Sequence, residues 1–102
     1  MRYTKIYGTG SYVPDKVITN EEMTKFVDTS DEWIVSRTGI KERRIVTDQS
    51  TLDLAEKAAL RAIESSNIDK DKIDLIIVAT VTSDYAFPGV SNLLQSRLGL
   101  DN

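Results

Sequence analysis

Trp33 and Arg37 stand four residues apart in the segment VDTSDEWIVSRTGI, residues 27–40. Trp33 is the only tryptophan of the chain. Positions i and i+4 of a helix project from the same face, so the indole ring and the guanidinium could hold one flat group together. This chemistry is binding, not bond making. Taken singly, each residue more often has a structural role, a tryptophan in a core and an arginine in a surface ion pair.

The residue types that are missing limit the chemistry further. The chain has no cysteine and no histidine, which excludes thiolate nucleophiles, imidazole bases and Cys/His zinc sites within its 102 residues. We therefore expect no metal site. Gly8 and Gly10 could begin a dinucleotide fingerprint, but Val13 stands where G-x-G-x-x-G requires its third glycine. We expect these glycines to allow close packing or a bulge in a strand instead.

Composition and charge are those of a soluble globular protein. The chain is 40% apolar and 28% charged, and its 13 basic and 16 acidic residues give a net charge of -3. There is no basic stripe for nucleic acid, and no apolar run reaches the roughly 20 residues of a membrane span. We expect one domain at most, in the cytoplasm, with no nucleic-acid or membrane partner.

A capped helix should position Trp33 and Arg37. Thr29 and Ser30 can each serve as N-cap, and Glu32 lies three residues after Thr29, in the capping-box position. The acidic residues near this point suit the positive end of a helix. A glycine past a helix commonly ends it, so a helix is expected over residues 28–39.

Other helices are predicted from caps and apolar spacing. A short helix should follow Thr19, with an apolar face of Met23, Phe26 and Val27. A long helix is expected over residues 50–67, with Ser50 and Asp53 as capping box, and a final one over residues 90–98 with Gly99 as its cap.

The strands indicate an α/β fold. Residues 73–81, IDLIIVATV, form an almost continuous apolar run, which is typical of a central parallel strand covered on both faces. Residues 3–12 are expected to form a strand, and residues 41–46 a short strand or hairpin arm. The loop at residues 83–89 would leave the carboxyl end of the central strand, where open α/β sheets bind ligands. Since so few strands leave unpaired edges, we expect the fold to be incomplete on its own.

Four motifs, taken together, resemble one enzyme family. They are GTGSYVP at residues 8–14, the helix start at Asn20 and Glu21, VDTSDEWIVSRTGIKERRI at residues 27–45 and DLIIVATVTSDYAFPG at residues 74–89. In this order, over essentially the whole chain, they resemble the N-terminal part of β-ketoacyl-acyl carrier protein synthase III. The resemblance implies that residues 1–102 are the N-terminal part of a thiolase-like domain, a mixed sheet with packed helices, truncated before the catalytic cysteine.

The resemblance also implies an activity. Members of the family are cytoplasmic homodimers that condense an acyl-CoA starter, often acetyl-CoA, with malonyl-acyl carrier protein to begin fatty acid synthesis. They use a cysteine that carries the acyl group, and a histidine and an asparagine that support decarboxylation. The family pattern puts all three beyond Asn102, so this chain has no catalytic residue of its own. CoA thioester is a substrate in this reaction, and no cofactor is bound permanently.

The binding residues implied by the resemblance are present in the chain. Trp33 would stack on the adenine of CoA, with Arg37 and Thr29 along the same nucleotide. Phe87 would reach across the dimer and form a wall of the partner subunit's acyl pocket. Two structural interpretations stay open: Thr29 as a helix cap, and Phe87 as an anchor on its own sheet.

Two other functions are compatible with the sequence. The first is another condensing enzyme of the superfamily, such as a hydroxymethylglutaryl-CoA synthase or a polyketide starter synthase. The second is a short non-catalytic product that binds CoA or pairs with a full-length synthase. The sequence around the missing cysteine, histidine and asparagine would separate the enzymes, and a stop codon after Asn102 would favour the short product.

Overall fold

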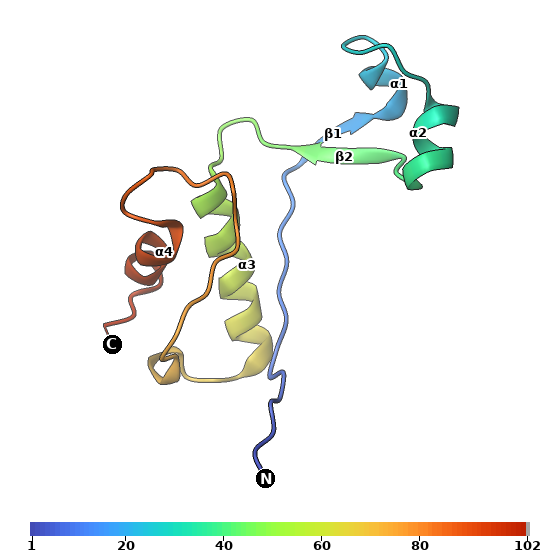
Figure 1. Cartoon of the computed structure of the whole chain (residues 1–102). Coiled ribbons are helices and arrows are strands. Elements are labelled where there is room, and N and C mark those ends of the chain that lie inside the picture. Colours follow the sequence, from blue (N-terminus) through green and yellow to red (C-terminus); the bar gives the residue numbers. More distant parts are fainter. Residues whose placement is uncertain (102) are drawn as a thin grey trace. The chain divides into compact units, whose positions relative to one another are not determined.

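Seven short elements make up residues 1–101, the part of the chain that the computed structural model describes (Figure 1). They fall into two compact units. The hairpin unit is Val13–Asp48 and contains β1 (Lys16–Thr19), α1 (Asn20–Met23), α2 (Asp31–Thr38) and β2 (Glu42–Ile45). The helical unit is Met1–Tyr12 together with the chain from Gln49 onward. It contains α3 (Thr51–Ser66), the 3-10 turn η1 (Lys70–Lys72) and α4 (Val90–Leu98).

In the hairpin unit, β1 and β2 form a two-stranded antiparallel sheet. Lys16 lies opposite Ile45, and Thr19 lies opposite Glu42. Thr19 also caps α1, because its side chain accepts a hydrogen bond of 3.2 Å from the backbone N–H of Glu22. The strand therefore continues directly into the helix. The strand expected at residues 41–46 is confirmed as β2, whereas β1 was not expected.

α2 is the predicted helix around Trp33, with a later start. Ser30 is its N-cap, since Ser30 Oγ accepts a 3.1 Å hydrogen bond from the backbone N–H of Trp33. Gly39 ends the helix in the left-handed conformation, with φ of 73°. The interpretation of Thr29 as the cap is wrong, because the residue that follows it performs this role.

In the helical unit, α3 and α4 pack through aliphatic side chains. Ser50 and Asp53 form the predicted capping box at the start of α3, and Gly99 ends α4 with φ of 69°. These two helices and their boundaries were predicted correctly to within a residue. The buried aliphatic residues are Leu52, Val90, Leu94, Leu98 and Leu100.

The N-terminal segment runs along α3 in close backbone contact (Figure 1). A Cβ atom at Gly8 would lie 2.7 Å from the carbonyl oxygen of Ala62. One at Gly10 would collide with the backbone of Ala58 and Ala62. The prediction that these glycines allow close packing is therefore confirmed.

Two predicted strands, residues 3–12 and 73–81, are not formed. A strand needs a neighbour to share its backbone hydrogen bonds, and within residues 1–101 neither segment has one. Residues 73–81 are also covered on one side only. Their partly buried side chains pack against the core, while Leu75, Ile77 and Val81 are exposed. The sheet of the described residues is thus small and antiparallel, without the expected parallel strand.

The prediction that the apolar face of the first helix, α1, extends to Phe26 and Val27 is also wrong. α1 ends at Met23, and the chain then turns through i to i−3 hydrogen bonds that end the α-helical spacing. Phe26 and Val27 are exposed as a result.

Among residues 1–101, no helix combines the length and apolar character that crossing a membrane requires.

Candidate functional site

α2 brings Trp33 and Arg37 together as the sequence predicts. The guanidinium carbon of Arg37 lies 5.0 Å from the centroid of the indole ring, within the range of a cation–π contact. Trp33 is 53% exposed, so much of the ring remains open to a ligand. Within the described residues Trp33 is therefore not a core residue, and the ion pairs found there do not include Arg37.

Thr29 contributes an unsatisfied polar atom beside Trp33. Its Oγ1 is buried and has no hydrogen-bond partner among residues 1–101. Leaving a buried hydroxyl without a partner is unfavourable, by roughly 1–3 kcal/mol. A cavity of about 320 Å³ is lined by Thr29 and Trp33 together with Asp28 and Ser30. Thr29 thus has an open hydrogen-bonding capacity next to an exposed aromatic ring.

Charge is distributed unevenly along α2. Asp31 and Glu32 lie in its first turn, and Arg37 lies in its last turn. Asp28, which lines the cavity beside Thr29, adds to the acidic side. An anionic group is therefore favoured near Arg37, and a neutral ring near Thr29.

Asn20 connects α2 to the rest of the hairpin unit, and sequence reasoning missed this role. The residue is 1% exposed. Its Nδ2 donates hydrogen bonds of 2.8 Å to Asp31 Oδ1 and 2.7 Å to the carbonyl oxygen of Ile40, and its Oδ1 accepts one of 2.8 Å from Arg43 Nη2. One signal in the sequence could have indicated this role. Because Thr19 already caps α1, the amide of Asn20 is not needed as a cap and is available for more distant partners.

Phe87 belongs to the helical unit and is 91% exposed. The loop before it is fixed at the start of α3. Asp84 Oδ1 accepts a 3.1 Å hydrogen bond from the backbone N–H of Leu52, and Thr51 Oγ1 donates one of 2.7 Å to the carbonyl oxygen of Thr82. The interpretation of Phe87 as an anchor on its own sheet is wrong for the described residues, because the ring is almost fully exposed.

The clearest charge interaction of the described chain lies outside these candidates and joins α3 to α4. Arg97 Nη1 donates to Asp53 Oδ1 at 2.5 Å and to Glu56 Oε2 at 2.9 Å. The backbone N–H of Ser50, and then Arg97, lower the pKa of Asp53 to about 2. The hydrogen bonds to Asp53 and then to Glu56 raise the pKa of Arg97. This network stabilises the helix pair and presents no open group to a ligand.

Comparison with known proteins gives one consistent family. No family model matches the chain. Beta-ketoacyl-acyl-carrier-protein synthase III of Clostridium acetobutylicum is 60% identical over 102 residues, which are 100% of this chain and 31% of that protein. The enzyme of the same name from Xanthomonas axonopodis pv. citri is 59% identical over 98 residues, 95% of this chain and 30% of that protein. The chain therefore spans about a third of the length of these relatives.

Solved structures agree with the sequence relatives. The crystal structure of 3-oxoacyl-acyl-carrier-protein synthase III from Aquifex aeolicus VF5 matches with a TM-score of 0.93 and 46% identity, over 98% of this chain and 32% of that chain. The priming beta-ketosynthase from the R1128 polyketide biosynthetic pathway matches with a TM-score of 0.92 and 36% identity, over 99% of this chain and 30% of that chain.

These likenesses identify the class as the thiolase-like condensing enzymes, and the partial thiolase-like fold predicted from the sequence is confirmed. Within that class, the chain is homologous to roughly the N-terminal 30% of β-ketoacyl-acyl carrier protein synthase III. The family resemblance predicted from the four motifs is confirmed as well.

Proposed function

We propose that the hairpin unit binds the nucleotide end of an acyl-CoA substrate. Supporting this, the unpartnered hydroxyl of Thr29 and the exposed indole of Trp33 line one cavity, with the guanidinium of Arg37 against the same indole. This combination is the observation that carries the proposal. It offers an aromatic platform, one free hydrogen-bonding group and one cation, which together match a base joined to phosphates.

The three residues would act at different parts of the nucleotide. Adenine is flat and uncharged, so it would stack on the open surface of Trp33, with the Thr29 hydroxyl bonding its polar edge or the ribose. Arg37 would bond to phosphate oxygens, since the acidic residues lie at the other end of α2. The charge distribution thus orients the nucleotide, with its base toward Thr29.

Phe87 would serve the other end of the substrate. An aromatic ring that is 91% exposed on a loop fixed at both Thr82 and Asp84 is suited to contact a second molecule. We propose that it forms part of the wall of the acyl pocket in the partner subunit of a homodimer. Bulk at this position would then affect which starter chain is accepted.

The bond-making chemistry would come from other residues. Residues 1–102 would form the N-terminal part of one thiolase-like domain in a cytoplasmic enzyme. This enzyme would condense acyl-CoA with malonyl-acyl carrier protein, and the relatives support the product class, since both are named beta-ketoacyl-acyl-carrier-protein synthase III. A cysteine, a histidine and an asparagine outside this chain would carry the acyl group and support decarboxylation. Fixing CoA at its nucleotide end would lower the entropic cost of bringing its thioester to the cysteine.

Tryptophan fluorescence of the full-length gene product tests the nucleotide site. Adding CoA should change the emission of Trp33, and the change should disappear in a Trp33→Phe variant. Arg37→Ala should weaken CoA binding about tenfold, which corresponds to about 1.4 kcal/mol for one charge-assisted contact. Thr29→Val should weaken binding without loss of thermal stability, because the hydroxyl that it removes has no hydrogen-bond partner among residues 1–101.

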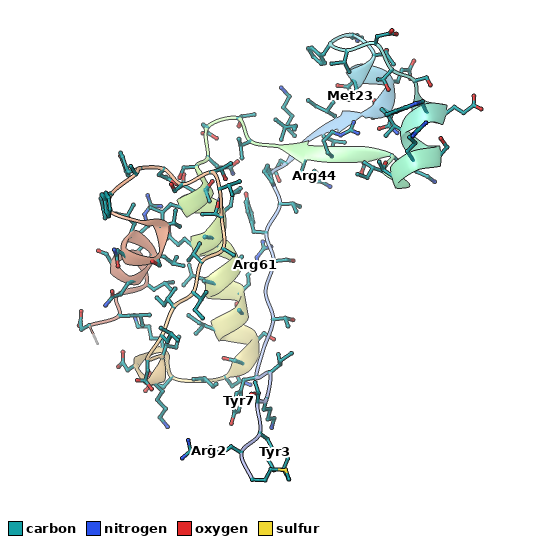
Figure 2. The ribbon with its side chains drawn as sticks, viewed as in Figure 1. Arg2, Tyr3, Tyr7, Met23, Arg44 and Arg61 are labelled. Carbon is teal, nitrogen blue, oxygen red and sulfur yellow. The ribbon has the colours of Figure 1, made fainter. Side chains whose placement is uncertain are left out.

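Arg61 provides the matched control. Its guanidinium stands over the ring of Tyr12 at 5.2 Å, a similar stacked arrangement on α3 in the other unit (Figure 2). Arg61→Ala should leave CoA affinity within about twofold of the original. An emission spectrum that saturating CoA does not alter, or equal losses in the two arginine variants, would count against the proposal.

A second function has support from one comparison. The R1128 priming beta-ketosynthase is 36% identical to this chain with a TM-score of 0.92. A priming role in polyketide synthesis would use the same nucleotide site with another partner carrier protein. Turnover of the full-length product with fatty acid and polyketide carrier proteins, compared at one acyl-CoA concentration, would decide between the two functions.

A further inference from the structure

We propose that Asn20 is a positioning residue for the nucleotide site, because its side-chain amide fixes the direction in which α2 presents Trp33 and Arg37. The inference rests on the function proposed above and adds a residue that does not touch the ligand. Its basis is the set of hydrogen bonds around one buried amide.

The bonds of Asn20 reach both ends of α2. One hydrogen of Nδ2 goes to Asp31, the first residue of the helix, at 2.8 Å, and the other goes to the carbonyl oxygen of Ile40, just past its end, at 2.7 Å. A single amide group thus holds the start and the end of the helix that carries Trp33 and Arg37. A shift of α2 in either direction would lengthen at least one of these bonds.

The amide is itself held by the sheet. Arg43, on β2, donates a 2.8 Å bond to Asn20 Oδ1 and a 3.4 Å bond to the carbonyl oxygen of Ile18, on β1. The backbone N–H of Asn20 donates a 3.1 Å bond to the carbonyl oxygen of Lys41. The side chain of Asn20 therefore links the orientation of α2 to both strands of the hairpin.

Aliphatic packing is limited in the described part of the hairpin unit. Pro14 is its one fully buried apolar residue there, and Ile18, Ile34 and Val35 are half-buried, whereas the polar Asn20 is 1% exposed. Hydrogen bonds are directional, and apolar contacts are not. The amide is thus the group that can set the angle of α2 as well as its position.

Asn20 is connected to the proposed nucleotide site through Thr29. Asn20 and Thr29 line a common cavity of about 440 Å³ with Ser30 and Asp31. Thr29 also lines the cavity beside Trp33. Binding that depends on a ring, a hydroxyl and a cation together is sensitive to shifts of about 0.5 Å in any of them. Loosening Asn20 should therefore weaken nucleotide binding while leaving the bond-making step intact.

An isosteric variant of the full-length gene product tests this role. Asn20→Asp keeps the shape of the side chain and an acceptor for Arg43, but it removes both donors and faces Asp31 with a second carboxylate. We expect the Kd of CoA, measured by calorimetry, and the KM of acyl-CoA to rise about tenfold, with kcat within about twofold. The emission of Trp33 without ligand should shift, since the surroundings of the ring change.

A second substitution should restore part of the function. Adding Asp31→Asn to Asn20→Asp supplies a new amide donor for the bond at the start of α2 but not for the bond to Ile40, so part of the lost CoA affinity and of the original Trp33 emission should return. Arg44→Gln is the control for general destabilisation. Arg44 lies on β2 (Figure 2) and donates a 3.0 Å bond to the carbonyl oxygen of Pro14, which precedes β1. It should leave CoA affinity within about twofold.

The outcomes separate this inference from the proposed function. If Trp33→Ala leaves CoA affinity unchanged, the proposed function fails, and the emission of Trp33 without ligand alone decides the positioning role. If Trp33→Ala weakens binding but Asn20→Asp changes neither affinity nor emission, the inference about Asn20 is overturned. It is equally overturned if Arg44→Gln lowers affinity as much as Asn20→Asp, or if the double variant restores nothing.

Discussion

The two units of the chain are held together by different forces. The helical unit has a buried aliphatic core between α3 and α4, whereas the hairpin unit is organised around the amide of Asn20. An aliphatic core gives much stability and tolerates small shifts of its members. A buried amide with three bonds gives less stability and more directional control. The unit that carries the proposed nucleotide-binding residues, Thr29, Trp33 and Arg37, is the one built with directional bonds.

The largest expected effect tests the aliphatic side of this comparison. Leu94 is 5% exposed in the core between α3 and α4. Leu94→Ala should lower the free energy of unfolding by about 2–5 kcal/mol, because it removes buried methyl groups and leaves a cavity. Chemical denaturation of the full-length gene product would measure this change.

Leu60→Ala is the control, because it makes the same leucine-to-alanine change on a helix without emptying the core. Leu60 lies on α3 and is 50% exposed, so its truncation should change the free energy of unfolding by well under half as much. CoA affinity should be preserved in both variants that fold. A strong loss of affinity in Leu94→Ala, with stability retained, would show that the two units do not divide the tasks as described.

A smaller effect is expected where the N-terminal segment meets α3. Gly10→Ala should destabilise the protein by about 1–3 kcal/mol, because the added methyl group meets helix backbone that cannot move aside. Gly89→Ala is the matched control, since a Cβ atom at Gly89 meets nothing within 4 Å. Thermal unfolding of the two variants should show a lowered midpoint for the first only. Equal midpoints would mean that the segment does not depend on backbone contact with α3.

Local signals in the sequence predicted the helices well. A cap acts through atoms only two or three residues away, so Ser50 with Asp53, and the glycines at positions 39 and 99, could be interpreted without the fold. The i to i+4 pairing of Trp33 and Arg37 is local in the same sense and was also predicted. The boundaries of α3 and α4, the end of α2 at Gly39 and the pair of candidate residues on α2 therefore followed from the sequence alone.

Features that depend on distant partners could not be predicted in this way. Asn20 bonds to residues 11, 20 and 23 positions away, and nothing in its neighbourhood indicates these partners. The strand β1 lacks a marked apolar alternation and exists because Glu42–Ile45 pairs with it. Conversely, residues 73–81 have the composition of a strand but no neighbour within the described chain. Strand formation depends on partners, and composition alone does not supply them.

The smallest expected effect concerns the exposed ion network of the otherwise aliphatic helical unit. Asp53 has its pKa lowered to about 2 from 3.8, first by the backbone N–H of Ser50 and then by Arg97. A carboxyl whose pKa is lower in the folded state stabilises the protein while it is ionised, above pH 4, and this contribution is lost as the pH falls from about 4 to about 2.

Asp53→Asn should remove that part of the acid sensitivity, so the difference in unfolding midpoint between the original protein and the variant should shrink across this range. Arg97→Gln should keep part of the dependence, because the Ser50 backbone bond, the largest cause of the lowered pKa, remains. A midpoint difference that stays constant from pH 5 downward, or one larger than that of Leu94→Ala, would contradict the view that aliphatic burial dominates this unit.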